Sequence, residues 1–240
     1  MTVKHMLFYL AVAVAIGANV KALSLNDGSG VTRRDALIGG SVAAFGLTTG
    51  GLYLPNPAFA GDEGAPIAVV GASGRTGALC VASCLRRGVP VRALTRSGEW
   101  PPKKVDLKAV DFDGDSTPAN ELLTISACDV KDASSLAAAV SGCRGVIYAA
   151  SASRKGGNSN EIDNLGVASV GDACLQANVA RYVILSSTAV TRPNSMGYKF
   201  TEMVVAGVMG AKRAGEVAVR DAYAKAKGSS SYTVIRPGGT

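Results

Sequence analysis

The stretch Gly71-Ala72-Ser73-Gly74-Arg75-Thr76-Gly77 decides the fold. It follows a short apolar run at 67–70, which predicts a buried strand, and precedes a segment at 78–87 that predicts a helix. In such a loop the first glycine permits a tight turn, the second lets the backbone approach a ligand, and the third lets the helix pack close to the strand. The exposed N–H groups and partial positive charge of the helix N-terminus favour an anion. An ordinary glycine turn would not need this strand–loop–helix context, so we predict a dinucleotide pyrophosphate site on 71–77.

Outward from this loop, short apolar runs alternate with amphipathic segments. Strands are expected at 91–94, 122–128, 146–149, 182–185 and 232–235, and helices at 134–140, 162–176 and 203–225. Strands that are apolar throughout are buried on both faces, which is typical of parallel sheets. The alternation predicts an α/β fold with a doubly wound parallel sheet, Rossmann-like, as a single domain over 66–240. Residues 97–121 hold Pro101-Pro102 and Asp113-Gly114-Asp115, which predict a surface excursion.

The residues after the second expected strand bear on the choice of cofactor. Enzymes that use NAD usually place an acid there for the ribose 2′-hydroxyl. This chain has Arg96 at that place and Arg75 in the glycine loop. A guanidinium group matches the geometry of a 2′-phosphate. The charge pattern therefore predicts NADP(H) rather than NAD, the alternative being a merely solvated Arg96.

Composition excludes several classes of protein. With 48% hydrophobic and 18% charged residues, the chain is that of a folded protein rather than a disordered one. The net charge of +7 is spread in isolated pairs with no nucleic-acid motif, so we expect no nucleic-acid partner. Five cysteines form no paired framework, and the single histidine, His5, lies far from them, so buried thiols are expected and no metal site.

The first 60 residues have the pattern of targeting segments. Residues 1–22 resemble a signal peptide, with Lys4 before an apolar run that is short for a membrane span. Residues 23–60 form a second segment, in which Arg33-Arg34 precedes an uncharged stretch that ends in Ala58-Phe59-Ala60, as in a twin-arginine or thylakoid transfer signal.

Tandem signals of this kind predict a plastid (chloroplast) location, including the thylakoid lumen, for a mature domain that begins near Gly61. In the alternative, 36–55 stays uncleaved as a membrane anchor, and the leader would be the only part that meets a membrane.

A set of short motifs, in order along 66–240, resembles the atypical short-chain dehydrogenase/reductase superfamily, in its NAD(P)-binding, NmrA-like branch. Each motif follows a predicted strand or lies on the long helix. The motifs are Gly-Ala-Ser-Gly-Arg-Thr-Gly at 71–77, Cys128-Asp129-Val130, Ala149-Ala150-Ser151, Ser186-Ser187-Thr188, Lys212-Arg213-Ala214-Gly215-Glu216 and Ile235-Arg236-Pro237-Gly238.

The resemblance implies where the cofactor lies. Asp129 and Val130 would contact the adenine, residues 149–151 the ribose groups, and residues 186–188 the nicotinamide. The family continues beyond its Arg-Pro-Gly motif into a substrate lid, so a chain ending at Thr240 is expected to be either a fragment or a protein without that lid. The full set of candidate cofactor residues is Gly71, Ser73, Gly74, Arg75, Thr76, Gly77, Arg96, Asp129, Val130, Ala149, Ala150, Ser151, Ser186 and Lys212.

The catalytic residues match the family only in part. Its oxidoreductases use Tyr-x-x-x-Lys, in which the lysine lowers the pKa of a tyrosine that acts as general acid. Lys212 matches the lysine and, with Thr188, is a candidate catalytic residue, but Val208 stands where the tyrosine belongs. Tyr223 has the spacing to Lys227 but falls too late on the helix, and Tyr198 could give a proton only from an unusual position.

Another interpretation makes Lys212 part of plain helix-surface ion pairs, with Glu216 paired to Lys212 and to Arg220 at the i,i+4 spacing.

Two functions remain open. One is an NADP(H)-dependent reductase that passes hydride to a small organic acceptor, whose identity and the oligomeric state the motifs do not specify. The alternative is a non-catalytic NADP(H) sensor or assembly factor for a plastid complex, which the missing tyrosine favours. A sugar-nucleotide epimerase is a weaker third reading, because it too needs the tyrosine.

Overall fold

The computed structural model describes residues 64–100, 119–153 and 156–237. The two predicted targeting segments, at 1–22 and 23–60, lie outside these residues, as does most of the predicted excursion at 97–121. Within the described ranges no helix is both long enough and apolar enough to cross a membrane.

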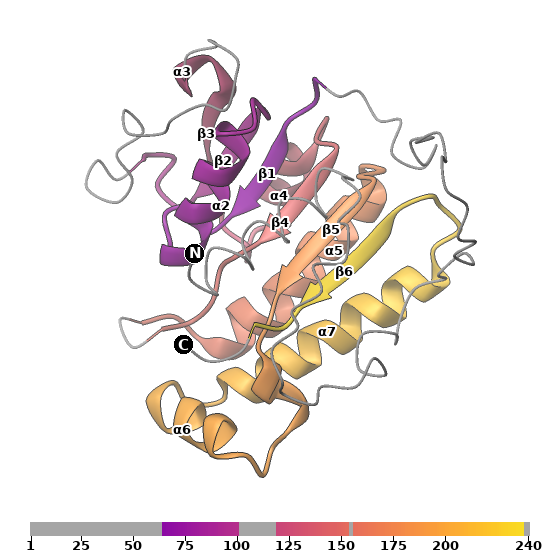
Figure 1. The fold of residues 1–240 in the computed structure, drawn as a ribbon. Coiled ribbons are helices and arrows are strands. Elements are labelled where there is room, and N and C mark those ends of the chain that lie inside the picture. The colour runs from indigo at the N-terminus through magenta and orange to yellow at the C-terminus, as the bar shows by residue number, and fades with distance from the viewer. Residues whose placement is uncertain (1–63, 101–118, 154–155, 238–240) are drawn as a thin grey trace, which may run out of the picture.

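Six parallel strands form one sheet, in the order β3-β2-β1-β4-β5-β6 (Figure 1). The strands are β1 (Ile67–Val70), β2 (Val91–Thr95), β3 (Leu123–Ala127), β4 (Gly145–Tyr148), β5 (Arg181–Leu185) and β6 (Ser231–Ile235). The order reverses between β1 and β4, and β1 pairs with both β2 and β4 in parallel register. In an open parallel sheet this reversal leaves a crevice at the carboxyl ends of β1 and β4. The doubly wound fold predicted from the sequence is confirmed.

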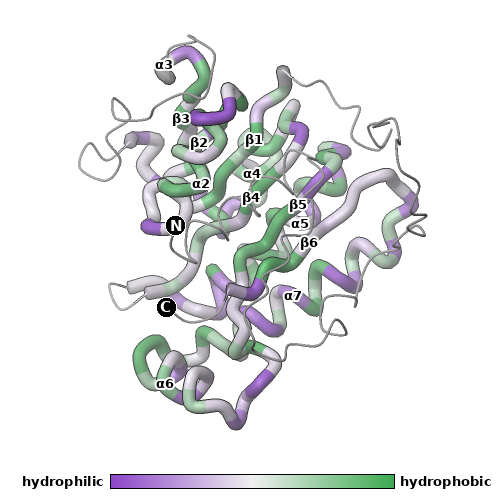
Figure 2. The backbone as a smooth tube through the Cα atoms, viewed as in Figure 1, coloured by the Kyte–Doolittle hydropathy of each residue, from purple (hydrophilic) through white to green (hydrophobic). Residues whose placement is uncertain are grey.

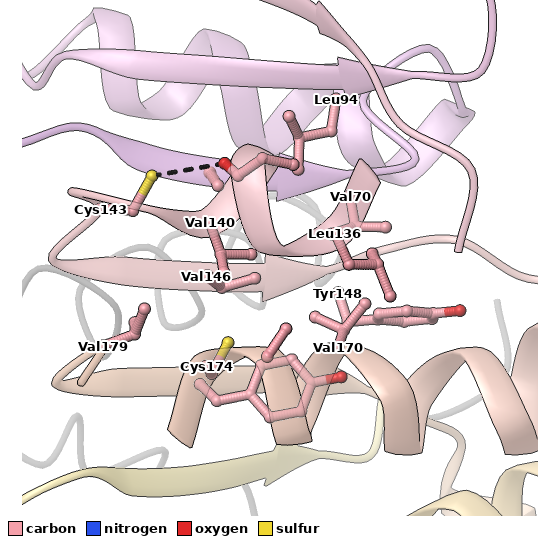
Figure 3. Packing of buried hydrophobic residues seen from close by; sticks show 14 of the residues in the cluster. Val70, Leu94, Leu136, Val140, Cys143, Val146, Tyr148, Val170, Cys174 and Val179 are labelled. Atoms are coloured by element: carbon pink, nitrogen blue, oxygen red, sulfur yellow. Dashed lines mark hydrogen bonds between the residues drawn. The ribbon is translucent and has the colours of Figure 1, made fainter. Parts of the chain in front are cut away.

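Helices cover both faces of the sheet. They are α2 (Arg75–Leu85), α3 (Ala119–Leu122), α4 (Ala133–Val140), the π-helix η3 (Asn160–Gly166), α5 (Val167–Gln176), the 3₁₀ turn η4 (Thr188–Thr191), α6 (Met196–Val204) and α7 (Val208–Lys225). Residues of α2 pack with alternate residues of the strands on one face, whereas α4, α5 and α7 pack on the other. Figure 3 shows part of the second core, where Tyr148 of β4 and Val170 of α5 lie together.

The central strands have the burial expected of a parallel sheet, and the edge strands do not. All four residues of β1 and of β4 are buried, because helices lie on both faces. β3 is half exposed, since it forms one edge of the sheet. The hydropathy colouring in Figure 2 follows the same division, with the apolar strands at the centre of the sheet.

The predicted helix at 203–225 is α7, which begins five residues later than expected, and its first two residues belong to a separate helix, α6, that was not predicted. α6 ends at Val204, and α7 begins after Gly207, which has a φ of 72° in the left-handed region. The Glu202 carboxylate accepts N–H bonds from Gly207 and Met209 at 2.7 Å each, and so caps α7. The apolar spacing continues across the break, which is why periodicity alone does not reveal it.

Candidate functional site

The glycine loop leaves the centre of the sheet, between β1 and α2. Gly71 has a φ of 74°, and a Cβ there would lie 2.7 Å from the Cα of Ala150. A Cβ on Gly77, which is buried in α2, would meet the carbonyl oxygen of Gly71. Both positions therefore require glycine, and the loop offers bare backbone to a ligand. This fits the predicted pyrophosphate cradle.

The N-terminus of α2 is open to an anion. Gly74 is the N-cap and provides no side-chain bond, and the first turn holds no acid. The first N–H groups of a helix have no partner within the helix, and the helix dipole places positive charge there. The helix begins at Arg75, three residues earlier than predicted, so its N-terminus lies within the glycine loop itself. A phosphate diester is the kind of ligand that this arrangement accepts.

Arg96 lies beside this loop. The Ala72 N–H donates to the Leu94 carbonyl at 3.2 Å, which ties the loop to the carboxyl end of β2. Arg96 follows two residues later with an exposed side chain, and Arg75 is exposed on the first residue of α2. Both residues are therefore candidates to meet the 2′-phosphate of a bound NADP(H), whose charge a guanidinium group would balance.

The predicted residues after β3 and β4 lie at the same edge of the sheet. Asp129 accepts an N–H bond from Lys131 at 3.0 Å, which fixes the turn after β3. The Val130 side chain packs against η3, where a Cβ on Gly166 would lie 2.9 Å from a Val130 methyl carbon. The Ala149 N–H donates to the Val70 carbonyl at 2.9 Å, so residues 149–151 run directly past the glycine loop.

Ser186, at the end of β5, carries a buried hydroxyl with no hydrogen-bond partner among the described residues. The residue is 8% exposed, and its N–H donates to the Ile235 carbonyl at 2.8 Å. An unpaired buried hydroxyl costs about 1–3 kcal/mol. A hydroxyl at the carboxyl edge of the sheet is placed to be satisfied by a ligand there.

Thr188, one of the two candidate catalytic residues, links two loops. Its hydroxyl donates to the Arg236 carbonyl at 2.7 Å, and its N–H donates to the Pro237 carbonyl at 3.0 Å. These bonds tie the end of β5 to the end of β6. The hydroxyl proton is therefore already committed to the protein.

Lys212, the other candidate, forms a buried ion pair. Its Nζ lies 2.7 Å from Asp163 Oδ1, and the Asp163 side chain is completely buried. Asp163 Oδ2 accepts the Ala152 N–H at 2.8 Å, so one carboxylate joins α7, η3 and the loop after β4. The pair places Lys212 next to the loop predicted to meet the cofactor ribose, with its charge already balanced.

The second buried carboxylate of α7 is Glu216, which is 4% exposed. Its oxygens accept bonds from Arg236 Nε at 3.0 Å and Nη2 at 2.6 Å. These hydrogen bonds to the Glu216 carboxylate raise the pKa of the Arg236 guanidinium. The surface-pair interpretation is therefore wrong for both predicted pairs, because Lys212 binds Asp163 and Glu216 binds Arg236, not each other or Arg220. Glu216 does have one partner on its own helix, Arg213, whose Nη1 lies 3.6 Å from Glu216 Oε2.

Val208 is part of a small core and not of a catalytic pair. It is 3% exposed and packs with Val190 and Met209, and Tyr198 is partly buried against the same cluster. Tyr223 packs edge-on against Tyr232 of β6, with ring centroids 5.2 Å apart. Burial is the main cause that raises its pKa.

All five cysteines are free and buried, as predicted. Burial is the main cause that raises the pKa of each thiol; for Cys84 the pKa reaches about 12. Across 64–100, 119–153 and 156–237, no group of three or more metal-ligating side chains could hold an ion.

A cavity of about 630 Å³ lies between the segment that ends at Asn160 and the α6–α7 junction. Ser159 Oγ donates to the Ala206 carbonyl at 3.0 Å beside it. Gly210 and Ala214, which line the cavity, lie on the opposite side of α7 from Lys212.

The model of the NAD(P)H-binding family matches residues 71–240. The chain belongs to the NAD(P)H-binding family. This match confirms the resemblance that the motifs indicated. In the glycine loop 71–77 of this family member, Gly71 and Gly77 have no room for a Cβ. No curated protein matches the chain at a significant level.

Solved structures share the fold of this NAD(P)H-binding protein at low identity. One from Bacillus halodurans, described as an NAD-dependent epimerase/dehydratase, has 19% identity and a TM-score of 0.54, with 73% of this chain and 71% of that one covered. Alfalfa (Medicago sativa) vestitone reductase has 18% identity and a TM-score of 0.51, covering 72% and 56%.

MoeE5, solved with UDP-glucuronic acid and NAD, has 20% identity and a TM-score of 0.52, covering 71% and 54%. This chain therefore spans little more than half the length of the last two proteins.

Sequence reasoning missed Asp163 and the partners of Glu216. A signal for Asp163 was present, because it shares a helical face with Val167, Val170 and Cys174, all of which are buried. An acid on the apolar face of a helix needs a buried partner.

Proposed function

We propose that this protein binds NADP(H) in preference to NAD(H) and is a reductase that passes hydride to a small organic acceptor. The observation that carries the cofactor choice is the exposed Arg96 at the end of β2, tied to the glycine loop through the Ala72–Leu94 hydrogen bond. When bound, NADPH supplies the hydride.

The chain's own groups would hold the cofactor by three means. The α2 N-terminus and the bare backbone of Gly71 and Gly74 would hold the pyrophosphate, and Arg96 and Arg75 the 2′-phosphate. The loop 149–151 would lie along the ribose, held in place by the Asp163 bond to Ala152. Ser186 would gain a partner for its hydroxyl at the nicotinamide end.

Titration of the full chain with NADPH and NADH tests the cofactor choice. Arg96→Ser is expected to weaken NADPH about 10- to 100-fold and to leave NADH unchanged, because only NADPH carries the 2′-phosphate. Arg192→Ser is the matched control, since Arg192 is also exposed but follows β5 rather than β2. Equal affinity for the two nucleotides in the wild-type chain would remove the Arg96 assignment.

A second candidate, a non-catalytic NADP(H) sensor or assembly factor, is favoured by one observation. None of the three positions expected to assist proton transfer has a group free to do so. Val208 stands in place of the tyrosine and is buried in a small core. The Thr188 hydroxyl donates to the Arg236 carbonyl, and Lys212 is paired with Asp163. A reductase of this kind must take its acceptor's proton from another group or from water.

A screen of quinone, flavin and aldehyde acceptors for NADPH oxidation distinguishes the two candidates. Turnover with any of them supports the reductase, and tight NADPH binding without turnover supports the sensor. If there is turnover, Tyr198→Phe asks whether Tyr198 donates the proton, and unchanged rates would exclude it.

We also propose a plastid location, supported by the tandem targeting patterns at 1–22 and 23–60. A reporter fused to residues 1–65 tests this, and a cytosolic signal would contradict it. Protease protection of the reporter in isolated plastids separates the lumen from a membrane anchored by 36–55.

A further inference from the structure

Helix α6 has its apolar side outward. Met196, Phe200 and Met203 are 79%, 63% and 76% exposed, and the spacing of four and three residues puts them on one face, here called the α6 stripe. No residue of α6 is fully buried. Figure 2 shows the apolar colouring of α6 at the periphery of the molecule, away from the sheet. A contiguous exposed apolar face of this kind marks an interaction surface.

The polar side of α6 is the one used inside the protein. Glu202 turns to α7, where its two oxygens accept the N–H groups of Gly207, Met209 and Gly210. Tyr198 packs against the small core formed around Val190. These contacts fix the orientation of the helix, so the α6 stripe cannot turn inward without uncapping α7.

The exposed charged residues next to the α6 stripe along the chain are positive. Between Ser186 and Gly210 the charged residues are Arg192, Lys199 and Glu202. Arg192 and Lys199 are exposed, whereas the Glu202 carboxylate is taken up by the N-terminus of α7. Lys199 lies at the border of the stripe, one position before Phe200. A partner for this surface should combine an apolar interior, into which the side chains can insert, with a negatively charged surface.

The size of the stripe argues for a lipid surface. The three side chains expose roughly 450 Å² together, taking about 200 Å² for a whole residue of this size. A stable protein interface needs about 800 Å² from each partner. A bilayer has no such minimum, because a few apolar side chains can insert while basic side chains meet anionic headgroups. We propose that the α6 stripe of this protein inserts into the surface of an anionic lipid bilayer.

A local probe tests this in the full chain, independently of any contribution from the leader. The chain has one tryptophan, Trp100, so a Trp100→Phe background makes an introduced tryptophan the single emitter. Phe200→Trp reports on the stripe, and Ile125→Trp is the matched control, being 36% exposed on β3 at the far edge of the sheet from β6. Circular dichroism checks that each variant folds.

The lipids are phosphatidylcholine vesicles with and without phosphatidylglycerol. With phosphatidylglycerol, emission of Phe200→Trp should shift to the blue, and that of Ile125→Trp should not. Met203→Ser should weaken the partition of Phe200→Trp about tenfold, and Lys199→Gln about fivefold on anionic vesicles alone.

Absence of the shift, or an equal shift for Ile125→Trp, would overturn the proposal. A blue shift that appears with protein concentration before lipid is added would also overturn it, because a second copy of the chain would then cover the stripe.

Discussion

The two ends of the cofactor crevice differ in how their residues are used. At the β1–α2 end, Gly71 and Gly74 put backbone without side chains beside the N-terminus of α2, whose first turn holds no acid and no side-chain cap. At the β5–α7 end, Thr188, Lys212 and Glu216 are held by other parts of the protein, and Val208 is core. The backbone at the binding end is thus available to a ligand, whereas the side chains at the end that would carry out chemistry are held in structural contacts.

The largest expected effect is at the binding end. Gly77→Val places a branched side chain against the Gly71 carbonyl, so the loop cannot keep its course and NADPH affinity should fall more than about 100-fold. The matched control is Gly210→Ala, because a Cβ there meets nothing within 4 Å. Calorimetric titration measures both. Unchanged affinity in Gly77→Val would place the cofactor elsewhere and remove the contrast between the two ends.

The next effect concerns the buried pair at the other end. Asp163→Leu leaves the Lys212 charge buried without its partner, which should lower the free energy of unfolding by about 3–5 kcal/mol. Adding Lys212→Met should restore part of that loss, because the apolar pair needs no charge balance. The Ala152 N–H would still lack its acceptor, so restoration is incomplete. Urea unfolding of the two variants measures this.

The same double variant sharpens the role of Lys212. If Lys212 contacts the cofactor in addition to pairing with Asp163, the Asp163→Leu/Lys212→Met chain should bind NADPH about tenfold more weakly than the wild-type chain. Full affinity in that variant would make Lys212 a structural residue only.

A smaller effect is expected at Val208. Val208→Ala removes two methyl groups from the cluster with Val190 and Met209, and should cost about 2 kcal/mol of stability with no change in NADPH affinity. Thermal unfolding and NADPH titration measure the two quantities. A large loss of affinity with intact stability would mean that this position faces the ligand after all.

The smallest effect near neutral pH comes from the buried thiols. Burial raises the pKa of Cys84 from 9.0 to about 12, so the folded state holds a proton that the unfolded state releases above pH 9. This contribution to stability is fully present below pH 9 and is lost as pH rises towards 12. The thiols should also resist alkylation in the native chain at pH 8 and react after unfolding. Rapid native alkylation of Cys84 would contradict its burial.

Local sequence was enough to predict the β1–loop–α2 unit and the strand–helix alternation. Everything that the glycine loop needs stands within seven consecutive residues, and strand burial and helix periodicity are local patterns that survive in any parallel α/β sheet. The place of Arg96 could be predicted for the same reason, since that place is defined only by the end of the second strand.

The roles of Lys212, Glu216 and Val208 depend on contacts that form only in the folded protein. Lys212 meets Asp163 from 49 residues away, and Glu216 meets Arg236 from 20 residues away. The i,i+4 spacing offered nearer partners. A buried charge on α7 must instead pair with a counter-charge on whichever element packs against that side of the helix. Which element packs against each side of α7 depends on the arrangement of the whole sheet. The spacing of residues along one helix could therefore not reveal the partners of Lys212 and Glu216.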